Sequence, residues 1–230
     1  MLRLRQWVHG LIPTPTRSSV AELFRVSPES PEARAIEFAA QLIRRGEVVA
    51  IPTDTFYGLA ADPFNLAAVD RIYSIKGRPE RRALPVLVTS VEQAQELALF
   101  LPEAFHRLVE KFWPGALTLV VEAAAKVPLK VTGNTGRIAL RLPDSRIAHA
   151  VISAVGTPIT GTSANLSGFA ACSSGEQVQK QLGDRLPLII DAGDTKARLA
   201  STIAELRDDG WRILREGVVT EQQIREALGG

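Results

Sequence analysis

Short apolar runs alternate with amphipathic segments along most of this chain. The residues at 31–45 place their apolar side chains at helical spacing, and the apolar run at 48–51 reads as a buried strand. Alternating helices and strands predict the α/β class. By the same reading, further helices are expected at residues 65–76 and 102–112 and after Ser90, Asp144 and Thr220, and strands at 84–88, 117–121, 138–142, 157–160, 188–191, 201–206 and 211–214.

The first 25 residues differ from the rest. Three arginines precede the first acidic residue, Glu22, a composition that a mitochondrial transit peptide shares. Pro13 and Pro15 oppose a continuous amphipathic helix there, so a poorly ordered or surface-draped arm is the alternative. The sequence predicts such an arm at residues 1–25, with residues 26–230 forming one domain, and deletion of residues 1–21 is expected to leave folding and turnover intact.

The charge balance excludes some classes of protein. With 27 basic and 25 acidic side chains, the net charge of +2 is too small for a protein that coats nucleic acid or binds a membrane surface. The single cysteine, Cys172, excludes an internal disulfide and a thiolate-rich metal site, as expected of a reducing compartment. No apolar run approaches the roughly 18 residues of a membrane span. We therefore expect a cytoplasmic protein.

Polar groups collect beside glycine or proline at the ends of four expected elements. The edge where strands end is where open α/β sheets place their ligands. No Walker-type, dinucleotide-binding or zinc-protease fingerprint is present, so the chemistry must come from elsewhere, and these four places stand out. They are Pro52-Thr53-Asp54-Thr55-Phe56-Tyr57-Gly58-Leu59, Lys76-Gly77-Arg78-Pro79, Thr162-Ser163-Ala164-Asn165-Leu166-Ser167-Gly168, and Ser201-Thr202-Ile203 with Leu214-Arg215-Glu216-Gly217.

Together the four segments resemble the YrdC/Sua5 family of threonylcarbamoyl-AMP synthases, over about residues 32–228 and in the family order. The resemblance implies a YrdC-like catalytic domain with a twisted open α/β fold around a large mixed sheet and one deep cleft. It also implies that threonine, bicarbonate and ATP are converted to threonylcarbamoyl-AMP and pyrophosphate, for the threonylcarbamoyl-adenosine modification of tRNA.

The resemblance assigns roles to individual residues. Lys76 and Arg78 match the basic pair expected to face the ATP phosphates and the reacting carbamate. Ser163, Asn165 and Arg215 match further ATP contacts. Contacts from the loop at residues 81–84, which departs from the family pattern, are left open. The threonine contacts that the resemblance implies are Thr53, Tyr57, Arg141 and Ser201.

The chemistry that the resemblance implies needs no resident metal. Mg²⁺ is expected to arrive bound to ATP, because the sequence shows no dedicated carboxylate cage. The implied partners are the three small substrates, the proteins that transfer the adenylate to tRNA, and tRNA itself if it binds directly.

Bland explanations exist for each segment. Thr53, Asp54 and Thr55 could cap a turn, Lys76 and Arg78 could neutralise the end of a helix, and Ser163 and Asn165 could form an Asx-type turn. Two other functions also fit the residues. One is a module that binds double-stranded RNA or tRNA without turnover, and the other is an enzyme of the same fold that transfers a carbamoyl group from carbamoyl phosphate.

Overall fold

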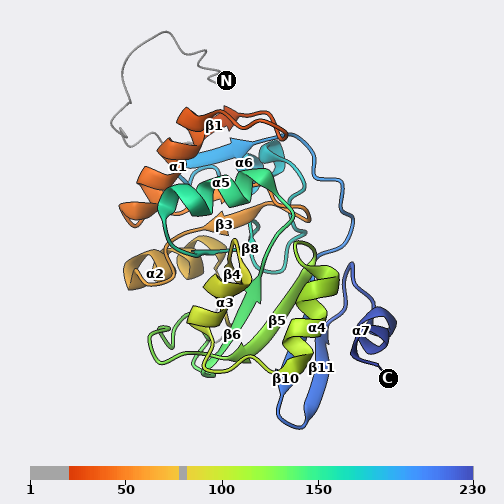
Figure 1. Cartoon of the computed structure of the whole chain (residues 1–230). Coiled ribbons are helices and arrows are strands. Elements are labelled where there is room, and N and C mark those ends of the chain that lie inside the picture. The colour runs from red at the N-terminus through yellow and green to blue at the C-terminus, as the bar shows by residue number, and fades with distance from the viewer. Residues whose placement is uncertain (1–20, 78–81, 230) are drawn as a thin grey trace.

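The computed structural model describes residues 21–77 and 82–229, whose strands form two mixed sheets (Figure 1). The predicted α/β class is confirmed, but the strands are divided between two sheets where the resemblance implied one large sheet. The first sheet has the order β1 (Glu22–Arg25), β9 (Leu188–Asp191), β2 (Val49–Ile51), β3 (Gly58–Ala60) and β8 (Thr162–Ser163). The second has the order β11 (Gly210–Arg215), β10 (Thr202–Arg207), β5 (Leu117–Glu122), β6 (Arg137–Arg141), β4 (Val86–Leu87) and β7 (Ile159–Thr160).

Helices cover the sheets. In Figure 1, α1 and α5 lie together over the first sheet, whereas α4 and α7 pack against each other beside the second. The apolar faces of α1 and α5 meet strand side chains in one buried cluster that includes Ile43, Ile51 and Val151. The helices are α1 (Ala33–Arg44), α2 (Leu66–Lys76), α3 (Val91–Leu97), α4 (Glu103–Phe112), α5 (Arg146–Val155), α6 (Gly175–Leu182) and α7 (Glu221–Leu228). No helix in the described part of the chain is long and apolar enough to cross a membrane.

Capping residues set the ends of α2, and this decides where the first candidate lysine lies. The Asn65 side chain accepts hydrogen bonds from the N–H groups of Ala67 and Ala68, which no residue within the helix can accept. At the other end Gly77 takes a left-handed conformation, with φ of 57°, which favours glycine. Helix α2 therefore ends at Lys76, as the sequence predicted.

The second sheet brings three strand ends together. Strands β5 and β10 are parallel, and β6 is antiparallel to β5, with Leu119 opposite Leu140. The first residues of β5 and β10 and the last residues of β6 therefore lie at the same end of the sheet. This register brings Thr118, Ser201 and Arg141 together at that end of the sheet.

The boundary predicted for the N-terminal arm is wrong. Residues 22–25 form strand β1, which pairs in parallel with β9 at the edge of the first sheet. Ala21 is also buried, and its N–H donates to the carbonyl of Gly183. No local pattern predicts this pairing, because the two strands lie more than 160 residues apart in the chain. The rest of the predicted arm lies outside the described residues.

We expect deletion of residues 1–25 to lower the free energy of unfolding by about 2 kcal/mol or more, because β1 carries backbone pairs and the partly buried side chains of Leu23 and Phe24. Deletion of residues 1–20 is the matched control, since it keeps Ala21 and β1. Denaturant unfolding of both truncated proteins measures the difference, and equal midpoints would show that β1 adds no stability.

Candidate active site

Eight of the nine candidate site residues line one cavity of about 300 Å³. The ninth, Arg78, lies outside the described residues. The walls come from both sheets and from the end of α2, so the four sequence segments meet although they are far apart in the chain. The eight residues are Thr53, Tyr57, Lys76, Arg141, Ser163, Asn165, Ser201 and Arg215.

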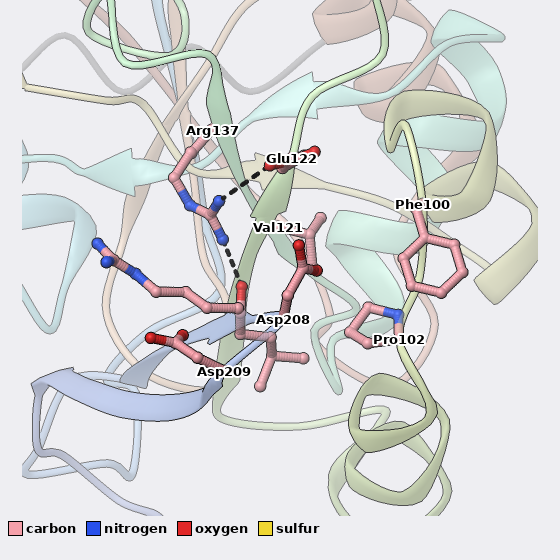
Figure 2. Close-up of a pocket in the computed structure, with 9 residues that line it drawn as sticks. Phe100, Pro102, Val121, Glu122, Arg137, Asp208 and Asp209 are labelled. Atoms are coloured by element: carbon pink, nitrogen blue, oxygen red, sulfur yellow. Dashed lines mark hydrogen bonds and ion pairs between the residues drawn. The ribbon is translucent and has the colours of Figure 1, made fainter.

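A larger cavity, of about 450 Å³, lies at the opposite end of strands β5, β6 and β10 (Figure 2). Phe100 and Pro102 form one wall, and Figure 2 shows the Arg137 side chain directed at Glu122. The described side chains that line this cavity include none of the eight described candidate residues, and its arginines are paired with carboxylates. Size therefore does not identify the site, and the cavity that gathers the polar segments is the better candidate.

The loop after β2 is organised by its own hydroxyl groups. Thr53 Oγ1 donates to the carbonyl of Phe56 at 2.7 Å and accepts from the N–H of Thr55 at 3.1 Å. The turn-capping explanation for these threonines thus describes real contacts. It does not exclude a binding role, because both threonines line the cavity.

Arg141 is buried at the end of β6, where it joins the two sheets. Its guanidinium donates from Nε to the carbonyl of Gly115 at 3.0 Å and from Nη1 to Thr55 Oγ1 at 3.0 Å. Its Nη2 lies 2.7 Å from Oδ1 of Asp54. Desolvation lowers the pKa of Arg141, and the Asp54 carboxylate opposes this shift. The charge of a buried arginine is therefore partly balanced.

Arg215, at the end of β11, is tied to the beginning of β10. Its Nη2 donates to the carbonyl and to the hydroxyl of Ser201, at 2.7 and 3.2 Å. The Ser201 hydroxyl also lies 3.0 Å from Oγ1 of Thr118. Desolvation and, second, the positive charge of Arg141 lower the pKa of Arg215. An anion bound near both guanidinium groups would relieve this repulsion.

Lys76 is buried at the end of α2, where its ammonium group meets the loop that follows β8. It donates to the carbonyl of Ser163 and to that of Asn165, the latter at 2.9 Å. These bonds reach beyond the helix, so neutralising the end of α2 does not account for the position of this lysine. Lys76 lines the same cavity as Arg141 and Arg215.

The side-chain amide of Asn165 forms hydrogen bonds within the loop that follows β8. Its Nδ2 donates to the carbonyls of Leu166 and Phe169, at 2.8 and 2.7 Å, and its Oδ1 lies 3.4 Å from the Lys76 ammonium. An Asx turn would have the amide oxygen accept a backbone N–H, whereas here the amide nitrogen donates to two backbone carbonyls. A nucleotide contact from Asn165 would have to use the remaining capacity of its oxygen.

Tyr57 lines the cavity, but its hydroxyl bonds to residues on the far side. That hydroxyl lies 3.0 Å from Asp191 Oδ1 and 2.7 Å from the carbonyl of Gly193, and it accepts from the N–H of Ala192. Burial raises the pKa of this tyrosine well above its usual value. The phenol oxygen of Tyr57 is thus committed away from the cavity, and its backbone N–H and carbonyl bond to Cys172 and Ala164.

Cys172 lies close behind the same wall. Its carbonyl accepts the N–H of Tyr57 at 2.9 Å, and its side chain is fully buried. Burial raises the pKa of the thiol to about 11, although the positive charge of Lys76 acts in the opposite direction.

Thr55 and Thr118 are among the cavity residues that were not individual site candidates. Thr55 belongs to a segment that the sequence singled out, but it received no role of its own. Thr118 lies inside the apolar run that forms β5, and nothing in the sequence separates its hydroxyl from those of other strand threonines. Only the structure shows that the Thr118 hydroxyl contacts the hydroxyl of Ser201, which precedes β10. In the described residues, no group of three or more His, Cys, Asp or Glu side chains could hold a metal ion.

Comparison with known proteins agrees with this arrangement. A profile of the Sua5/YciO/YrdC family, described as "Telomere recombination", matches residues 41–217. The chain belongs to the Sua5/YciO/YrdC family. The match spans the loop after β2, the end of α2, the loop after β8 and the Ser201–Arg215 pair, so the segments that build the cavity all lie inside the family region.

Several members of the Sua5/YciO/YrdC family carry an informative name. The threonylcarbamoyl-AMP synthase of Bacillus subtilis is 40% identical over 83% of this chain, which spans 56% of that relative. A putative threonylcarbamoyl-AMP synthase of Mycobacterium tuberculosis is 36% identical over 91% of this chain and 96% of its own length. The crystal structure of Pyrococcus abyssi Sua5 complexed with L-threonine matches with a TM-score of 0.88 at 36% identity, over 91% of this chain and 61% of that chain. The chain therefore spans a little over half the length of some relatives and nearly the whole length of others.

Proposed function

We propose that this protein makes threonylcarbamoyl-AMP and pyrophosphate from L-threonine, bicarbonate or CO₂, and ATP. The observation that carries the proposal is the meeting of eight candidate residues from separate segments on one cavity. The names of its relatives in the Sua5/YciO/YrdC family, and the threonine bound in one of their structures, support the choice of substrates.

The proposed reaction has to bring several anions together. The threonine amine captures carbon dioxide as a carbamate, and a carbamate oxygen attacks the α-phosphorus of ATP, which expels pyrophosphate. The threonine carboxylate, the carbamate and the triphosphate repel one another in water. Lys76, Arg141 and Arg215 on one cavity would offset that repulsion and stabilise the charge that develops on the phosphoryl oxygens.

Each residue keeps the role that its position supports. Arg141 would bind the threonine carboxylate, with Thr53 and Ser201 nearby and the ring of Tyr57 closing the pocket. Lys76 would face the reacting carbamate and the phosphate, and Ser163, Asn165 and Arg215 would contact ATP. Arg78 stays a prediction for the same phosphates. Mg²⁺ would enter as part of the ATP complex.

The proposed product would pass to tRNA through partner proteins, and these partners, like a cytoplasmic location, stay predictions. The cavity of about 300 Å³ suits small molecules and is far too small for an RNA duplex, so a binding module for RNA is the weaker alternative. A carbamoyl-transfer enzyme would use carbamoyl phosphate, and the substrates consumed distinguish it.

We expect pyrophosphate release to require threonine and bicarbonate together, because the nucleophile is built from both. Purified protein with ATP and Mg²⁺ should release pyrophosphate and form an adenylate containing labelled threonine only when both are supplied in CO₂-depleted buffer. Release that is equal with either one omitted would contradict this mechanism. Turnover of carbamoyl phosphate instead would support the carbamoyl-transfer alternative.

A further inference from the structure

Arg141 is held by three partners on three sides. An arginine has five N–H donors, and the carbonyl of Gly115, the hydroxyl of Thr55 and the carboxylate of Asp54 each accept one. The contacts of Arg141 therefore leave one N–H on Nη1 and one on Nη2. A carboxylate that binds a guanidinium through two parallel bonds needs two such donors.

Asp54 is placed to act on this guanidinium from outside the cavity. The described lining of the cavity includes Arg141 but not Asp54, whose carboxylate is 15% exposed. The two residues come from different sheets, since Asp54 follows β2 and Arg141 ends β6. Asp54 can therefore affect a ligand in the cavity only indirectly, by its contact with Arg141.

We propose that Asp54 is a positioning residue, which fixes the Arg141 guanidinium so that its two remaining N–H donors receive the carboxylate of the amino-acid substrate. This inference rests on the proposed function. Thr55 holds Nη1 in the same way, and its hydroxyl is itself fixed by Thr53, whose Oγ1 lies 3.1 Å away. The loop after β2 would thus orient the arginine through two adjacent side chains.

Orientation and charge balance predict opposite effects when Asp54 is lost. If Asp54 only reduces the positive charge at Arg141, its removal would strengthen the binding of a carboxylate. If Asp54 fixes the guanidinium, its removal lets the side chain turn, and binding weakens because the two donors are no longer preorganised.

We expect Asp54→Ala to raise the KM for threonine about tenfold or more, with the KM for ATP and kcat at saturating threonine within about threefold of the wild type. Asp54→Asn should restore most of the affinity, because an amide oxygen still accepts from Nη2. Asp70→Ala is the matched control. Asp70 lies on the surface of α2, away from the cavity, and pairs with Lys130. If Asp54→Ala is unstable, Thr55→Val removes the second side-chain partner and should raise the same KM.

Direct titration with threonine distinguishes the ways in which this inference could fail. A wild-type protein that neither binds threonine nor turns over would overturn the proposed function, and this inference with it. A wild-type protein that binds threonine, together with Asp54→Ala and Thr55→Val variants of unchanged or tighter affinity, would overturn the positioning role alone.

Discussion

Replacement of Lys76 by alanine is expected to lower turnover by about 100-fold or more, because it removes a cation from the place where the proposed transition state is most anionic. Some loss of stability should accompany the loss of activity. The ammonium of Lys76 also donates hydrogen bonds to the carbonyls of Ser163 and Asn165. The loss of a donor to buried carbonyls lowers the free energy of unfolding by about 1 to 3 kcal/mol. Steady-state pyrophosphate release and thermal unfolding of the same preparation measure the two effects.

Lys111 provides the matched control for Lys76. It also lies in the last turn of a helix, α4, but it is exposed and away from the cavity. Lys111→Ala should cost about 0.3 to 1 kcal/mol at most, as expected for a lysine that interacts with a helix dipole, and it should leave turnover unchanged. A Lys76→Ala protein that makes the adenylate at nearly the wild-type rate would remove Lys76 from the active site.

Replacement of Arg141 by lysine is expected to raise the KM for threonine about 100-fold while the KM for ATP changes little. Lysine keeps the charge but loses the planar group that contacts Gly115, Thr55 and Asp54 at once, and with it the two donors for a carboxylate. Initial rates at varied threonine and fixed ATP measure the KM for threonine. Initial rates at varied ATP and fixed threonine measure the KM for ATP.

Arg137 offers a control in the same strand. It begins β6, whereas Arg141 ends it, and its partners are Glu205 and Glu122 at the other cavity. Arg137→Lys should leave the KM for threonine unchanged. An unchanged threonine KM in Arg141→Lys would show that the substrate carboxylate binds elsewhere, and an equal rise in both variants would point to a general loss of structure.

Local signals predicted most of the helices well. The capping box of α7 is present, with Thr220 accepting from the N–H of Gln223 and the Gln223 side chain accepting in return, and Gly156 ends α5 in a left-handed conformation. Such features depend on residues within one or two turns, so the sequence carries them directly. Helix α6 was missed because its eight residues have few apolar side chains to mark a buried face.

Long-range pairing could not be predicted in the same way. Strand β8 has two residues, and it exists because it pairs with β3 at Gly58 and Leu59, about a hundred residues earlier. The division of the strands between two sheets likewise depends on partners distant in the chain.

The candidate site shows a similar limit. The segments that the resemblance singled out meet at one cavity, but the direction of the Tyr57 hydroxyl, the burial of Lys76 and the partnership of Thr118 with Ser201 depend on three-dimensional packing. A sequence gives the chemical type of a side chain. Its neighbours decide which of its atoms are free to bind a ligand.

The burial of Cys172 makes this protein a convenient subject for site-directed labelling. It is the single cysteine of the chain, and a fully buried thiol with a raised pKa reacts slowly with maleimides near neutral pH. A cysteine introduced on the surface would therefore be the main reactive thiol without any prior substitution. A pair of such cysteines, one on each sheet, could carry a donor and an acceptor dye whose energy transfer reports whether the walls of the cavity approach each other when substrates bind.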